Sequence, residues 1–131
     1  MPSFTLKQTG PHTLHVQGDG WSFHIDHKVS ETDAVRGPSP TELLAISLAA
    51  CKTITAIVWA ERRGIALQNL ETDVAYDMAE GPRRVGKIEV ALRQLKGQVP
   101  ADQLERLERA LKGCYVAATL EHPPAVISNI E

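Results

Sequence analysis

The stretch that decides the fold is residues 39–64, SPTELLAISLAACKTITAIVWAERRG. Its first residues form a capping box, in which Ser39 is the N-cap, Pro40 takes the first helical position and Glu42 takes the third. The stretch ends on Arg-Arg-Gly, a cationic last turn followed by a glycine stop. These signals predict a helix over residues 40–63, about 36 Å long at 1.5 Å per residue.

Residues 43–60 are apolar on almost every face of that helix. The length is sufficient to span a membrane, but Lys52 lies in the middle of the segment, and a charge at mid-bilayer costs at least about 2.5 kcal/mol. A helix that is apolar nearly all round is equally typical of the buried centre of a soluble domain. We therefore expect no membrane segment, and we expect a second copy of the chain to cover this helix in a homodimer.

The remaining sequence contains short alternating segments on both sides of the helix. We expect strands at residues 4–8, 13–17, 21–26, 70–78 and 88–92, helices from Pro100 and over residues 114–120, and a last edge strand at 125–130. This order predicts an α+β fold with an antiparallel sheet and a long buried central helix. The length of 131 residues predicts a single domain over residues 1–131.

Composition excludes several classes of function. The chain is 43% hydrophobic and 23% charged, and its net charge of −2 leaves no electrostatic footprint for nucleic acid or an anionic membrane. Residues 1–10 have no apolar signal segment, which predicts a cytoplasmic protein. The histidines have no metal-ligand spacing and no glycine-rich phosphate loop is present, so we expect neither a metal nor another cofactor.

The two cysteines, Cys51 and Cys114, are the residues most suited to chemistry. Either could simply fill space in the core, since free cysteine is among the most buried residue types. Cys114 begins a predicted helix, and the partial positive charge there is expected to lower its pKa. Cys51 lies in the middle of a helix, so its thiolate needs a nearby cation, and adjacent Lys52 points about 100° away around the helix.

Two motifs resemble the OsmC/Ohr family, which comprises the osmotically induced protein and the organic hydroperoxide resistance protein. GPSPTELL at residues 37–44, followed by Ala-Ala-Cys at 49–51, is similar to the family's proline-led helix with its cysteine. CYVAATL at residues 114–120 is similar to the segment that carries the second family cysteine, with Tyr115 where a proline is usual. The resemblance covers essentially the whole chain.

This resemblance implies an OsmC-like fold as an intertwined homodimer, with active sites at the subunit interface. It implies a thiol peroxidase for small organic hydroperoxides that takes part in the oxidative stress response. Cys51 would be the peroxidatic cysteine and Cys114 the resolving one, and a cellular dithiol would reduce their disulfide. No metal, haem or flavin is needed.

The sequence departs from the family at a pair of charged residues. Family peroxidases have a glutamate directly after the helix-opening proline, and it pairs with an arginine from an early strand. Here Thr41 follows the proline, and residues 4–26 contain no arginine. Arg36, in the loop before the helix, is the first candidate to replace that arginine as a catalytic group, and His24 is the second.

Two functions therefore remain open at the level of sequence. One is the Cys-based peroxidase, and the other is an OsmC-like dimer that binds an apolar ligand or senses redox state without efficient peroxidase activity. The thiol pair favours the enzyme, whereas the missing Arg/Glu pair favours the binding protein. The sequence does not identify the hydroperoxide, the ligand or the reductant.

Overall fold

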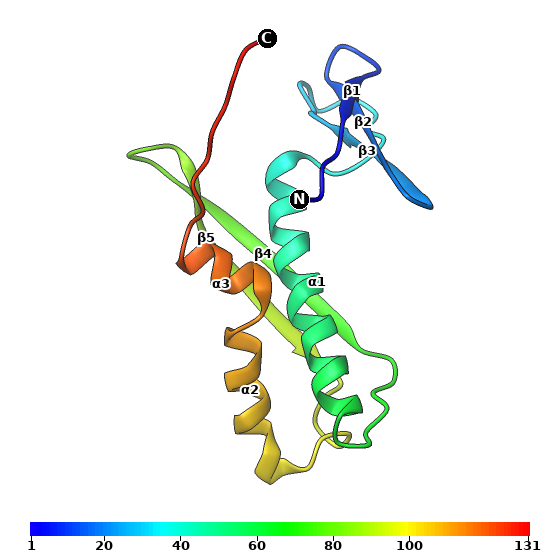
Figure 1. Ribbon diagram of the computed structural model, residues 1–131, viewed down its shortest axis with the longest axis vertical. Coiled ribbons are helices and arrows are strands. Elements are labelled where there is room, and N and C mark those ends of the chain that lie inside the picture. Colours follow the sequence, from blue (N-terminus) through cyan, green and yellow to red (C-terminus); the bar gives the residue numbers. More distant parts are fainter. The chain divides into compact units, whose positions relative to one another are not determined.

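The computed structural model describes all 131 residues, and the chain divides into two compact units, Met1–Leu44 and Ala45–Glu131. The elements, labelled in Figure 1, are β1 (Leu6–Gln8), β2 (Thr13–Gly18), β3 (Trp21–Asp26), α1 (Pro40–Glu61), β4 (Glu71–Ala79), β5 (Arg84–Arg93), the 3₁₀ helix η1 (Ala101–Gln103), α2 (Leu104–Lys112) and α3 (Tyr115–Glu121). Helix α1 begins in the first unit and continues through the second. The predicted α+β architecture with antiparallel sheets is confirmed.

The first unit is an antiparallel sheet of order β1-β2-β3. Val16 and Ile25 alternate with polar neighbours and are the buried apolar residues of its strands, as period-two patterning predicts. Strands β2 and β3 are joined by a tight turn at Asp19-Gly20, where Gly20 has φ +81°. That left-handed conformation favours glycine because residues with a Cβ atom rarely adopt it.

Asp26, at the end of β3, ties the loop before α1 to the sheet. One carboxylate oxygen accepts hydrogen bonds from the Thr13 hydroxyl and the His27 N–H, both at 3.0 Å, and the other accepts from the Arg36 N–H at 3.1 Å. These donors, the Arg36 N–H foremost, lower the pKa of Asp26. In the same loop a Cβ atom on Gly37 would lie 1.8 Å from the His24 carbonyl oxygen, so this close approach requires glycine.

Both ends of α1 have the capping contacts that the sequence predicts. The Glu42 N–H donates to the Ser39 hydroxyl at 3.2 Å, and the Ser39 N–H donates to the Glu42 carboxylate at 3.0 Å, which completes the capping box. At the other end Gly64 has φ +75°, its N–H donates to the Glu61 carbonyl, and the Ile65 N–H donates to the Ala60 carbonyl at 2.9 Å. This pair of bonds is a Schellman motif, which ends the helix at Glu61 rather than at residue 63.

In the second unit the β4–β5 hairpin, α2 and α3 pack around α1 (Figure 1). The hairpin is antiparallel, with a register irregularity at Asp77/Met78. One core cluster contains the buried residues Ala56, Trp59, Ala60, Val99 and Leu107. A second, smaller cluster contains Leu48, Cys114 and Ala117.

The predicted edge strand at residues 125–130 is wrong. The chain has no regular structure after α3, and Val126, Ile127 and Ile130 are 84% or more exposed. A strand is stabilised by hydrogen bonds to a neighbouring strand, and none pairs with this segment. Alternating apolar residues alone were therefore insufficient to form a strand.

Other parts of the same chain cover only one side of helix α1. Ile46, Ala50, Ile54 and Val58 follow one another at intervals of four residues, and all four are exposed. They form a continuous apolar ridge, called here the α1 ridge. By length and composition α1 could also cross a membrane, a test that core helices of soluble proteins pass as well, and 33% of its apolar window is buried.

We predict that Glu42→Ala lowers the free energy of unfolding by about 0.5–2 kcal/mol, because it removes half of the capping box. The two Ser39 hydrogen bonds lower the pKa of Glu42, so this stabilisation is present above the ordinary pKa of glutamate and is lost as the pH falls through the lowered value. Chemical denaturation at several pH values measures both effects. Glu42→Gln is the matched control, since glutamine can complete the same box and should retain most of the stability at neutral pH.

Candidate functional site

The fold brings the two cysteines into one cluster. Cys51 lies on α1, and Cys114 is the N-cap residue of α3. Cys114 is a buried member of the smaller cluster, and Cys51 is half-buried against that cluster together with Ile88 and Val90 of β5. The sequence separates the two thiols by 63 positions, and packing of α3 against α1 and β5 brings them together.

The sulfur atom of Cys51 faces the first turn of α3. The backbone N–H of Val116 donates to the Cys51 Sγ, with an N···S distance of 3.5 Å. Both cysteines are free thiols. This contact places the Cys51 sulfur against the segment that begins with Cys114.

Cys114 does not have the lowered pKa that its place at a helix start predicts. Burial raises the pKa of this thiol, and the side chain is only 4% exposed. The Ala117 N–H lowers the pKa, whereas the neighbouring Cys51 thiol raises it further. The loss of hydration outweighs the local helix field, because an ionised sulfur is strongly disfavoured in an apolar environment.

Within the second unit, Lys52 is a cationic side chain that acts on Cys114. Its ammonium donates to the Leu111 carbonyl oxygen at 2.8 Å and lowers the pKa of Cys114 by a smaller amount than burial raises it. Arg36 and His24 belong to the first unit, and their assignment to the thiol site stays a prediction. The Arg36 backbone is held by Asp26, and its side chain is exposed.

A cavity of about 830 Å³ borders Cys51 on the outer side of α1. Its walls come from α1, the turn after it, the end of α2 and the start of α3: Cys51, Ile54, Thr55, Val58, Trp59, Arg62, Arg63, Ala110 and Tyr115. Tyr115 is 91% exposed. The Arg63 guanidinium lies 3.8 Å above the Trp59 ring and donates to the Trp59 carbonyl, which fixes one cationic corner of the cavity.

This cavity was not predicted from the sequence. The apolar residues Ile54 and Val58 were assigned to a buried helix face, and only the structure shows them lining an open space beside a thiol. No group of three or more His, Cys, Asp or Glu side chains comes together as a metal-ligand set. The cavity therefore offers a thiol, apolar walls and arginines at one end.

Comparison with known proteins identifies the relatives of this chain. A family model described as OsmC-like protein matches residues 31–129. A protein of Psychrobacter arcticus whose name links it to osmotic stress and detoxification has a similar structure, with a TM-score of 0.78 at 23% identity over 91% of this chain and 88% of its own.

An OsmC-like protein of Mycoplasma pneumoniae has a TM-score of 0.74 at 18% identity, over 92% of this chain and 87% of its own. A Legionella pneumophila protein described as organic hydroperoxide resistance protein OsmC has a TM-score of 0.59 at 18% identity, over 92% and 90%. At these identities the likeness shows the fold. Among curated protein sequences none matches the chain.

We predict that Cys114 is alkylated slowly at neutral pH, because its raised pKa leaves little reactive thiolate. The measurement is the rate of reaction with iodoacetamide as a function of pH in a Cys51→Ser variant. The midpoint of this profile should lie above that of the same variant unfolded in urea. An equal or lower midpoint in the folded protein would contradict the assignment of burial as the dominant influence.

Proposed function

The chain belongs to the OsmC-like protein family, and on that premise we propose that it is a thiol peroxidase that reduces small organic hydroperoxides. Cys51 is the peroxidatic residue, Cys114 is the resolving residue, and a cellular dithiol restores both thiols in a reducing cytoplasm. The observation that carries the proposal is the packing of both cysteines in one cluster, with Cys51 bordering a cavity.

The two thiols and the peroxide exchange the atoms of the oxidative steps. The Cys51 thiolate attacks one peroxide oxygen, an S–O bond forms, the O–O bond breaks, and the leaving alkoxide takes a proton to become an alcohol. The Cys114 thiolate then attacks the Cys51 sulfur, a disulfide forms and hydroxide leaves, which a proton converts to water. An external dithiol reduces the disulfide by exchange.

The environments of the two thiols support this division of roles. Cys51 is half-buried beside the cavity, where a hydroperoxide has access. Cys114 is buried, and its raised pKa keeps it protonated at neutral pH, so it is a poor first nucleophile. Cys51 itself contributes to that raised pKa, and its negative charge disappears when it becomes a sulfenic acid. Oxidation of Cys51 therefore favours ionisation of Cys114 at the step that requires it.

Arg36 is our first candidate for the cation that stabilises the Cys51 thiolate. Its backbone is anchored by Asp26, while its exposed side chain is free of an ion pair. A guanidinium is always charged at neutral pH, and a cation within about 4–6 Å stabilises a thiolate. Arginine from an early strand has this task in the family, and no early-strand arginine is present here.

We also propose that the active form is a homodimer in which the α1 ridge is covered by the partner chain. Ile54 is 60% exposed and Ile46 is 46% exposed, although both lie in an apolar helix. Exposed apolar side chains in one continuous ridge indicate a protein interface. A ridge of residues spaced by four fits the grooves of a second helix.

A second candidate function is ligand binding without turnover. The cavity beside Cys51 has apolar walls at Ile54, Val58 and Tyr115 that would suit an apolar ligand. In that case the thiols would serve redox sensing. The two functions differ in whether the thiols are consumed by an organic hydroperoxide.

We predict that reduced protein loses two thiols per chain on reaction with cumene hydroperoxide, measured by thiol titration. Cys51→Ser should abolish the reaction, and Cys114→Ser should leave a sulfenic acid at Cys51 that dimedone labels. Arg36→Ala should slow the reaction, with Lys28→Ala in the same loop as the control. Thiols that survive excess hydroperoxide at pH 7 would contradict the peroxidase and favour the ligand-binding protein.

We predict that light scattering after size exclusion gives twice the 14.3 kDa mass of one chain. Ile54→Lys should shift the protein toward the monomer, because it places a charge in the middle of the α1 ridge. Val126→Lys is the matched control, since Val126 is an exposed aliphatic residue outside the ridge. A monomeric wild-type protein at micromolar concentration would refute the dimer.

A further inference from the structure

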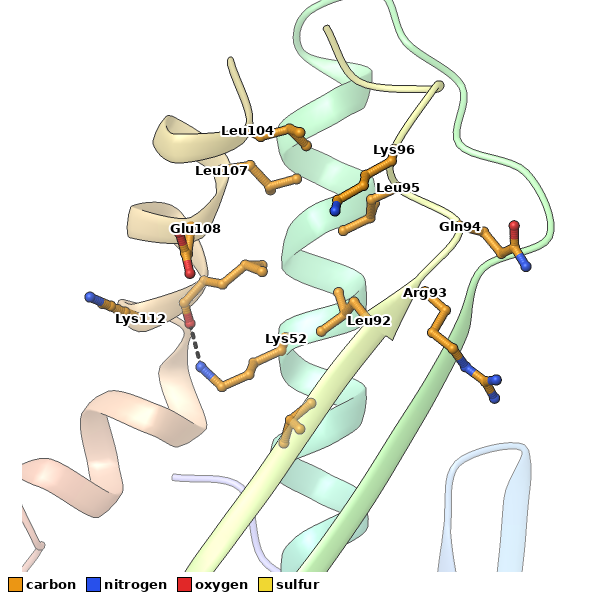
Figure 2. A pocket seen from close by; sticks show the side chains of 12 residues that line it. Lys52, Leu92, Arg93, Gln94, Leu95, Lys96, Leu104, Leu107, Glu108 and Lys112 are labelled. Carbon is orange, nitrogen blue, oxygen red and sulfur yellow. Dashed lines mark hydrogen bonds between the residues drawn. The ribbon is translucent and has the colours of Figure 1, made fainter. Parts of the chain in front are cut away.

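A second cavity lies in the second unit, between the end of β5, α1 and α2 (Figure 2). Its volume is about 660 Å³, within the range of about 300–1,000 Å³ that is typical of small-molecule sites. Leucine side chains from three segments line it, namely Leu92, Leu95, Leu104, Leu107 and Leu111. We call this cavity the leucine groove, and neither cysteine lines it.

Lys52 is the half-buried cation at one end of the leucine groove. Its ammonium donates to the Leu111 carbonyl at 2.8 Å, as the dashed line in Figure 2 marks. An ammonium has three protons to donate, and no carboxylate forms an ion pair with this one. A partly desolvated cation without a counter-ion attracts an anion more strongly than a fully hydrated one.

The other basic side chains around the leucine groove add to its positive charge or point away from it. Lys96 is directed toward the groove in Figure 2 and also lacks an ion pair. Arg93 is paired with Glu71 at 3.2 Å and Asp73 at 3.0 Å, and it extends away in Figure 2, as Lys112 does. Glu108 is the single carboxylate among the lining residues, so the groove has an excess of positive charge.

We propose that the leucine groove binds an aliphatic monocarboxylate of medium chain length, with its carboxylate on Lys52 and its chain against the leucines. The lysine supplies charge-assisted hydrogen bonds, and the leucines remove the chain from water. Leu104, Leu107 and Leu111 cover about 10 Å of α2 at 1.5 Å per residue, which suits an extended acyl chain. A purely polar anion such as phosphate would leave the half-buried Leu104 and Leu111 uncovered.

The proposed ligand contacts neither cysteine, so its binding can be measured apart from the consumption of peroxide. The proposal assigns a second site to the face of α1 that carries Lys52, whereas the cavity beside Cys51 lies on the face that carries Ile54 and Val58. Loss of one site therefore need not abolish the other. The experiment below separates them.

The test is a titration of the reduced, full-length protein with sodium decanoate below its micelle concentration, followed by amide chemical shifts in NMR spectra. We expect saturable shifts in residues 90–96 and 104–112. Lys52→Gln should weaken binding about tenfold or more, since it removes a charge-assisted hydrogen bond. Lys112→Gln is the matched control and should bind as the wild type does. The neutral analogue 1-decanol should bind more weakly by a similar factor.

Two further variants keep the test decisive if Lys52→Gln disturbs α2 through its contact with Leu111. Lys52→Arg keeps the charge and should retain binding, and Leu104→Ser should weaken binding through the apolar wall alone. Cys51→Ser should still bind decanoate, whatever its effect on peroxide consumption. Equal binding of decanol and decanoate, shifts confined to the cavity beside Cys51, or no saturable shifts would each overturn the proposal.

Discussion

The geometry of the thiol site depends first on where α1 begins. The reciprocal hydrogen bonds between Ser39 and Glu42 fix that point, and each later residue turns about 100° around the axis. Cys51 is therefore placed on the side of α1 that meets β5 and α3, and Lys52 is turned toward the leucine groove.

Burial reverses the effect on the pKa of Cys114 that the sequence alone predicts. The helix start at Cys114 is visible in the sequence and favours a thiolate, but the core around Cys114 is not visible there. In the structure the loss of hydration dominates and raises the pKa of Cys114. The sequence around a residue shows whether it begins a helix and so lies in the positive field of a helix start. The loss of hydration depends instead on which distant elements pack against that residue.

The same distinction explains how much of the fold and site the sequence predicted. The capping box, the glycine stop at Gly64 and the strand alternation are local signals, and the structure confirms them. The edge strand at residues 125–130 failed because a strand depends on a partner that periodicity does not reveal. The leucine groove was missed because its lining comes from α1, β5 with the segment after it, and α2, which are far apart in the sequence.

Lys52 connects the two sites electrostatically. Its ammonium lowers the pKa of Cys114 from one side of α1, and the same ammonium is the proposed anchor of a carboxylate in the leucine groove. A bound carboxylate would neutralise this charge, so burial would oppose ionisation of Cys114 with less compensation. Formation of the disulfide requires the Cys114 thiolate, so occupancy of the groove would slow the attack of Cys114 on oxidised Cys51. The first attack on peroxide does not involve Cys114 and would not be slowed in this way. The single residue that follows the peroxidatic cysteine thus provides a physical route from ligand binding to the second step of the proposed reaction.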